Sequence, residues 1–231
     1  MRRGVFVHGN HLGYSRNLTL NESIALLKKT FPKNDPIQYL NNTSYEYKGI
    51  IFLGCCLYTN FKLYGEDRQD IAMISAARGM NDFIYPRYED KDGTIRTLTT
   101  DDYLELFEKS RLFLKEKLIE NIGKPVVIVT HFAPCINSVG EEYKNSSLNP
   151  AFVVDMTDLM REYNNIRVWC HGHVHSKHDY LCYSTRIVAE PFGYYTEWGD
   201  KSTSGYGKKI KISDIKSMRP WEDILKQKNK S

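Results

Sequence analysis

The chain contains 231 residues, of which 41% are hydrophobic, and this suits one domain with a substantial core rather than two domains. A net charge of +4 is small for this length, and the lysines that collect near the C-terminus indicate a solvated tail and give no sign of a nucleic-acid partner. Five cysteines do not make a disulfide framework, and no apolar run approaches the roughly 20 residues of a membrane helix. We therefore expect a cytoplasmic protein with no membrane partner.

Strands and helices are expected to alternate along the chain. Thr19 and Glu22 form a possible capping box ahead of a short helix that Pro32 ends. In chain order, the pattern predicts a strand at 5–7, a helix at 24–29, a strand at 47–53, helices at 67–78 and from Thr100 to Gly123, a strand at 126–130, a helix from Asn149 to about Tyr163, and strands at 168–170, 187–189 and 209–212.

Three of the expected strands are followed by loops that carry metal-ligating residue types. These residues are Asn10 and His11, then His131, then His171, His173 and His175. Ligand sites in open α/β sheets lie at the carboxyl ends of the strands, so we expect one shared metal site. Imidazole nitrogen and amide oxygen suit zinc, manganese or iron.

Local geometry supports this expectation. His173 and His175 stand at positions i and i+2, which on extended backbone point to the same side. Gly9 and Gly172 precede the clusters and let the backbone approach an ion or phosphate without a Cβ clash. The alternative for the His-x-His pattern alone is a solvent-facing strand, but the repeated format of the three loops favours ligands.

The same residues resemble a known family. The segments Gly9-Asn10-His11, Thr130-His131-Phe132-Ala133-Pro134 and Gly172-His173-Val174-His175 look like the last three motifs, in order, of the calcineurin-like metallophosphoesterases. By that resemblance, the fold is a four-layer α/β/β/α sandwich. One metal ion would be held by Asn10, His131 and His173, His175 would belong to a second ion, and His11 would be the catalytic histidine beside the leaving group.

Two motifs of this family are absent from the 231 residues. The family normally begins with Asp-x-His and Gly-Asp-x-x-Asp, which supply the other ligands and the bridging carboxylate, and neither stands before Gly9. We therefore expect an N-terminally truncated sandwich that binds one divalent ion (Mn, Fe or Zn) where the intact family holds two. The missing segment could be supplied by another chain. Leu12 also stands where the family usually has an acidic residue.

Two functions follow from these observations. The first is a metal-dependent phosphoesterase that hydrolyses small phosphomonoesters or phosphodiesters through metal-activated water. The alternative is a non-catalytic homologue that binds one metal, a phosphorylated ligand or a protein partner. In both cases the domain would span 1–231, with an insertion around 58–96 and a Lys-rich tail around 213–231. Within the insertion, the segment Gly79-Met80-Asn81-Asp82-Phe83 resembles an insertion of a bacterial and phage-like branch of the family, and by that resemblance it would overhang the site, where Arg78 or Arg87 could contact a substrate phosphate. The alternative is a surface excursion.

Overall fold

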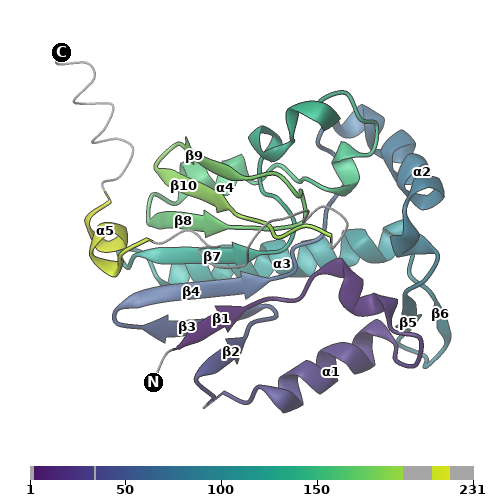
Figure 1. Ribbon diagram of the computed structural model, residues 1–231, viewed down its shortest axis with the longest axis horizontal. Helices are drawn as coiled ribbons and strands as arrows, with labels where there is room; N and C mark the ends of the chain where they lie inside the picture. The colour runs from purple at the N-terminus through teal and green to yellow at the C-terminus, as the bar shows by residue number, and fades with distance from the viewer. Residues whose placement is uncertain (1–2, 34, 195–209, 219–231) are drawn as a thin grey trace.

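A six-stranded mixed sheet forms the centre of the computed structural model, which describes residues 3–33, 35–194 and 210–218 (Figure 1). The strand order is β3-β4-β7-β8-β10-β9. The four inner strands are parallel: β4 (Ile50–Cys55), β7 (Val126–Thr130), β8 (Ile166–Cys170) and β10 (Thr185–Ala189). The edges are the antiparallel strands β3 (Thr43–Tyr47) and β9 (His178–Cys182).

Both faces of the parallel strands are buried, which explains their nearly continuous apolar sequence. Side chains alternate between the faces, so Ile128 packs toward α3 (Thr100–Glu120) and α4 (Thr157–Glu162), while Val127 packs toward α5 (Ile212–Ser217). Helix α2 (Gln69–Gly79) lies on the side to which the parallel strands point (Figure 1). None of the helices in the described residues is both long and apolar enough to cross a membrane.

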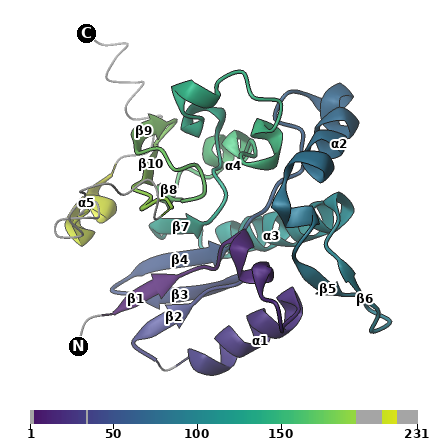
Figure 2. The ribbon, with the colours of Figure 1, turned by 45° about the vertical axis from the view of Figure 1, so that its right-hand side comes forward.

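A smaller parallel pair, β1 (Gly4–Phe6) and β2 (Ile37–Tyr39), lies beside β3 and β4, with α1 (Leu20–Thr30) outside it (Figures 1 and 2). The aromatic ring of Phe6 contacts the ring of Phe31 at a centroid distance of 4.9 Å and that of Tyr39 at 5.3 Å. Gly54 in β4 has no side chain, and this leaves space for the side chain of Leu40, which follows β2. The small pair is thereby packed against the large sheet.

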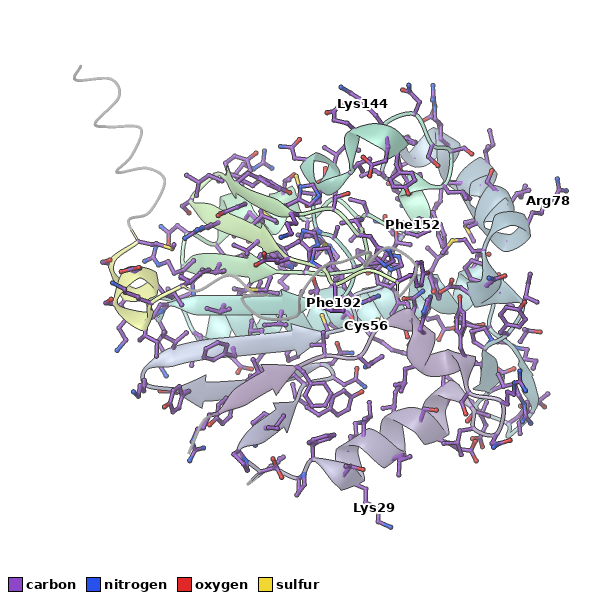
Figure 3. All side chains as sticks on the ribbon, in the orientation of Figure 1. Lys29, Cys56, Arg78, Lys144, Phe152 and Phe192 are labelled. Carbon is purple, nitrogen blue, oxygen red and sulfur yellow. The ribbon has the colours of Figure 1, made fainter. Side chains whose placement is uncertain are left out.

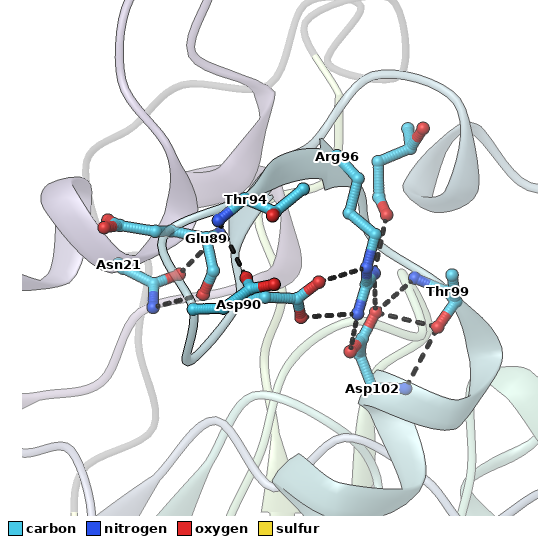
Figure 4. Close-up of polar contacts among 9 residues, drawn as sticks. Asn21, Glu89, Asp90, Thr94, Arg96, Thr99 and Asp102 are labelled. Carbon is cyan, nitrogen blue, oxygen red and sulfur yellow. Dashed lines mark hydrogen bonds and ion pairs between the residues drawn. The ribbon is translucent and has the colours of Figure 1, made fainter.

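The expected insertion contains the hairpin of β5 (Arg87–Glu89) and β6 (Ile95–Thr97). Arg96 joins this hairpin to the start of α3, because its guanidinium donates two hydrogen bonds to Asp90, both of 2.8 Å, and two to Asp102, of 2.6 and 2.8 Å (Figure 4). Asp102 also forms the capping box of α3 with Thr99. One buried carboxylate thus fixes both the helix start and the hairpin.

Several predicted elements are confirmed. The capping box of Thr19 and Glu22 begins α1, and the helices predicted at 67–78 and from Thr100 are α2 and α3. A 3₁₀ turn, Glu66–Arg68, precedes α2. The predicted strands at 126–130, 168–170 and 187–189 correspond to β7, β8 and β10.

The strand predicted at 47–53 is confirmed from Ile50 onward as part of β4, but the chain turns between Tyr47 and Ile50. Lys48 and Gly49 both have positive φ, of 51° and 73°, which is the backbone of a tight two-residue hairpin turn between β3 and β4. The sequence pattern did not predict this turn, because Tyr47 and Ile50 both suit a strand and an apolar run follows them.

The single helix predicted from Asn149 to about Tyr163 is wrong. A 3₁₀ turn, Asn149–Ala151, is followed by extended backbone, where Val153 forms an isolated parallel bridge with Ala133. Helix α4 begins only at Thr157, whose backbone N–H donates to Asp155 at 2.9 Å. A β-branched pair, Val153 and Val154, and the local hydrogen bond between Asp155 and Thr157 therefore divide the predicted helix.

The C-terminal expectations are only partly within the described residues. A strand was predicted at 209–212, but Ile210 and Lys211 are irregular and Ile212 begins α5, while Lys209 lies outside the described part. The expected Lys-rich tail lies outside it from residue 219 onward.

Candidate functional site

The carboxyl ends of β1, β7 and β8 lead into one pocket of about 820 Å³. All five of the expected site residues line this pocket, namely Asn10, His11, His131, His173 and His175. The expected convergence is therefore found, although β1 belongs to the small sheet and β7 and β8 to the large one.

Asn10 and His131 make the closest contact in the pocket. The Oδ1 atom of Asn10 lies 2.8 Å from Nε2 of His131. Gly9 makes this approach possible, because a Cβ atom at that position would lie only 2.6 to 2.9 Å from three atoms of the His131 ring. We expected Gly9 to make room for an ion or a phosphate, whereas in the structure it makes room for an imidazole.

His173 is held deep in the pocket by aromatic rings. Its ring lies 4.8 Å from that of His131, 4.3 Å from that of Phe132 and 4.7 Å from that of Phe152, measured between centroids. Its backbone is left-handed, with φ of 67°, so the expected extended geometry of the His-x-His pair is wrong. A histidine in this region is strained, and such strain concentrates at functional sites.

The Nε2 atom of His173 is buried and has no hydrogen-bond partner among the described residues. An unpaired buried nitrogen costs free energy, and a metal ion is one ligand that would compensate it. This nitrogen therefore has a lone pair that a ligand in the pocket could use.

His11 and His175 stand nearer to solvent than His131 and His173. Both are exposed, and both contact Tyr194: the ring of His175 meets it edge-on at 4.5 Å, and that of His11 lies parallel to it at 6.0 Å. The ring of Tyr14 stacks on His11 at 4.3 Å. His11 therefore lies at the pocket mouth, where it can meet a ligand that enters.

Burial keeps the inner histidines neutral. It is the largest cause that lowers the pKa of His131 to about 3, and the nearby histidines, His11 first, lower it further. Burial and then the charge of His131 hold the pKa of His173 well below its usual value. Only the neutral imidazole offers a lone pair to a metal, and burial favours this form in both rings.

Asp82 is a site residue that the sequence analysis did not identify. It lies in a 3₁₀ turn of the insertion, Asn81–Phe83, is 4% exposed, and lines the pocket. Its carboxylate accepts a hydrogen bond of 2.6 Å from the amide nitrogen of Asn10. Position 82 falls within the insertion expected around 58–96, but no spacing rule relates it to position 10.

Two further histidines have structural partners. His8 is buried, and its Nδ1 atom lies 2.8 Å from the hydroxyl of Tyr39. His171 is engaged at both ring nitrogens, by the hydroxyl of Ser138 at 2.9 Å and the carbonyl of Gly172 at 3.0 Å. Neither residue lines the pocket.

The two arginines considered for phosphate binding do not line the pocket either. Arg78 and Arg87 are both exposed. Figure 3 shows Arg78 projecting outward from α2, whereas Phe152 lies inside, near the ends of the strands. The expected phosphate contact by Arg78 or Arg87 is therefore not found.

Three side chains fit part of the ligand set of one divalent ion. Asn10 Oδ1 and His131 Nε2 are 2.8 Å apart, the distance of a hydrogen bond. Two ligand atoms about 2.1 Å from one ion lie about 3 Å apart in octahedral and about 3.4 Å apart in tetrahedral coordination, so a small separation of the two side chains would admit an ion. The unpaired nitrogen of His173 adds a third donor. Within the described ranges, no group of three or more His, Cys, Asp or Glu side chains could hold a metal. The candidate ligand set therefore consists of two histidines and the side-chain amide of Asn10, and it contains no carboxylate.

Comparisons with known proteins agree with this architecture. The phosphopantetheinyl hydrolase of Mycobacterium tuberculosis has a similar crystal structure, with a TM-score of 0.63 and 16% sequence identity over 87% of this chain and 73% of that chain. The chain has a phosphoesterase-like α/β fold.

The other comparisons add little to this result. A putative 5'-nucleotidase from Staphylococcus aureus gives a TM-score of 0.36 at 12% identity, over 80% of this chain and 32% of that chain, and this likeness is too low to bear on the fold. No family model matches the sequence, and no curated protein matches it significantly.

Proposed function

We propose that the chain is a metal-dependent hydrolase of small phosphomonoesters or phosphodiesters. One observation carries the proposal: the oxygen of Asn10, Nε2 of His131 and the unpaired Nε2 of His173 occupy the pocket that also contains His11. The similarity in fold to a phosphopantetheinyl hydrolase supports the reaction class.

Each side chain has a role that its position permits. Asn10, His131 and His173 would hold one Mn, Fe or Zn ion, with His175 as a fourth ligand from the same pocket. Such an ion supplies charge stabilisation to the phosphoester and lowers the pKa of water. His11, at the pocket mouth, would donate a proton to the oxygen of the leaving group.

The aromatic side chains would shape the rest of the pocket. Phe152 packs its ring against His173 at an angle of 20°, which excludes water from that side of the imidazole. Tyr14 stacks on His11 and limits the orientations of its ring. A ligand that entered would therefore meet His11 in a restricted geometry, which favours proton transfer along one direction.

A second function is favoured by the composition of the ligand set. The 231 residues contain neither Asp-x-His nor Gly-Asp-x-x-Asp, and the set that fits in the described residues has no carboxylate. A one-ion site of this kind would bind a phosphorylated ligand without efficient turnover. Both functions would require one bound metal ion, and they differ in whether the protein hydrolyses the phosphorylated ligand.

One experiment separates them. The chelated protein is reconstituted with Mn, Fe or Zn, and its metal content is measured together with hydrolysis of bis(p-nitrophenyl) phosphate and p-nitrophenyl phosphate. We expect one ion per chain and metal-dependent hydrolysis, both lost in His131→Ala. The matched control is His178→Ala, since His178 is half-buried in β9 outside the pocket. Bound metal without hydrolysis would favour the binding function, and a protein that binds no metal would contradict the proposal.

A further inference from the structure

Asp82 is a buried carboxylate that accepts hydrogen bonds from three separate parts of the chain. The donors are the side-chain amide of Asn10 at 2.6 Å, the hydroxyl of Tyr14 at 2.8 Å and the hydroxyl of Tyr103 at 2.5 Å. Asn10 and Tyr14 belong to the 3₁₀ turn after β1, whereas Tyr103 belongs to α3. Asn10, Tyr14 and Asp82 all line the pocket, whereas Tyr103 is fully buried.

The carboxylate oxygen of Asp82 accepts this hydrogen bond, and its donor on Asn10 is the amide nitrogen. The oxygen of the same amide then faces the other way, toward Nε2 of His131, which lies 2.8 Å from it. Because that nitrogen meets an oxygen, it carries the proton in the metal-free protein, and Nδ1 of His131 is unprotonated. Asp82 thus determines the orientation of one residue and, through it, the tautomer of another.

The orientation matters because the two ends of an asparagine amide have nearly the same shape but opposite chemistry. The oxygen can bind a cation, whereas the NH₂ group cannot. Nothing in the shape of the pocket distinguishes the two flips, and a hydrogen bond to a carboxylate is among the stronger contacts that can do so.

We propose that Asp82 is a positioning residue that fixes the side chain of Asn10 with its oxygen toward the metal site. The inference rests on the proposed function, since it gives Asn10 the role of a metal ligand. Residues that orient a ligand in this way affect metal affinity although they do not touch the ion. The insertion expected around 58–96 contributes Asp82, and it therefore takes part in forming the metal site.

The test compares Asp82→Asn with the wild type and with Asp90→Asn. Asp90 is a matched control because it is also a hydrogen-bonded carboxylate of the insertion, but it pairs with Arg96 and does not line the pocket. Titration of the chelated full chain with Mn²⁺ in a calorimeter should show affinity about 10- to 100-fold weaker for Asp82→Asn. The affinity of Asp90→Asn should stay near that of the wild type.

A second measurement does not require metal. The ¹⁵N shifts of the histidine rings report which nitrogen carries the proton, so the metal-free wild type should show His131 protonated at Nε2. In Asp82→Asn the two amides can pair in either orientation, and we expect a mixture of tautomers at His131. If Asp82→Asn does not fold, the Tyr14→Phe/Tyr103→Phe variant replaces it, because it removes two of the three contacts that hold the carboxylate.

The results distinguish this inference from the proposed function. If the wild type binds Mn²⁺ and the variant binds it equally well with an unchanged His131 tautomer, the role of Asp82 is wrong and the proposed function stands. If the wild type binds no metal, the proposed function fails, and the tautomer measurement alone decides whether Asp82 orients Asn10. Weaker binding together with a mixed tautomer supports the inference.

Discussion

The Nε2 atom of His131 lies 2.8 Å from the Oδ1 atom of Asn10, although 121 positions separate the two residues in the chain. The contact joins the loop after β1 in the small sheet to the loop after β7 in the large one. It depends on Gly9, over whose backbone the His131 ring lies. The arrangement of the site thus depends on how closely two loops of different sheets approach each other.

Gly9→Ala should therefore disturb the site more than the fold. The backbone of Gly9 has φ of −98°, which alanine adopts freely, so the effect comes only from the clash of Cβ with His131. We expect metal affinity about 10- to 100-fold weaker by calorimetry. Gly4→Ala is the control, since nothing lies within 4 Å of a Cβ there. Equal metal binding by both variants would show that the contact between Gly9 and His131 does not position the site.

Replacement of His11 should impair catalysis without impairing metal binding. In His11→Gln we expect kcat for phosphodiester hydrolysis to fall by about 10² to 10⁴, the usual contribution of a general acid. The loss should be greatest for substrates with poor leaving groups, because these need the proton most. The measurement is kcat for a series of aryl phosphodiesters, and a uniform loss across the series would argue against proton donation by His11.

The buried His8 should make the folded protein sensitive to acid. Burial, and then the positive charge of Lys28, lowers the pKa of His8 to about 4, whereas an unfolded histidine titrates near 6.5. The unfolded chain therefore binds more protons between these values. The stability from neutral His8 is fully present above about pH 6.5 and is lost as the pH falls toward 4.

Urea unfolding at pH 7 and pH 5 checks this expectation. In His8→Gln the decrease in the free energy of unfolding between the two pH values should be smaller than in the wild type by up to about 2 kcal/mol. An identical decrease in both proteins would mean that His8 does not contribute to the acid sensitivity.

The ion pairs of Arg96 should stabilise the fold more than a surface ion pair does. Arg96 contacts two carboxylates, and the side chain of Asp102 is only 7% exposed, so Arg96→Gln leaves a buried charge without its cation (Figure 4). We expect the free energy of unfolding to fall by about 1 to 3 kcal/mol. Lys144→Gln is the control, because its pair with Glu141 is exposed and should contribute less than about 1 kcal/mol. Similar values for both variants in urea unfolding would contradict the expectation.

The sequence indicated the α/β class and that the loops after β1, β7 and β8 would converge. The apolar runs of β7 and β8 and the capping box of α1 are local signals, and they correspond to elements of the structure. His131 and His173 could be grouped because β7 and β8 are parallel neighbours that end at one edge of the large sheet. Asn10 was grouped with them by the same format of strand and loop, but β1 belongs to the small sheet, so its approach to His131 depends on the packing of two sheets.

Local patterns were insufficient where backbone geometry or distant contacts decided the outcome. Lys48 and Gly49, which have positive φ, form a turn inside the segment that was predicted as one strand. The bridge between Val153 and Ala133 replaces part of a predicted helix with extended backbone. The left-handed backbone of His173 likewise replaced the extended geometry expected from its spacing.

Asp82 shows most clearly what only the tertiary structure decided. Its sequence neighbours give no sign that its carboxylate meets Asn10, Tyr14 and Tyr103, because these contacts span 72, 68 and 21 positions. By itself, the sequence determined which residue types stand at the strand ends, since a strand and its following loop are local. The tertiary structure determined the orientation of Asn10, since a hydrogen bond between distant segments exists only once the chain has packed.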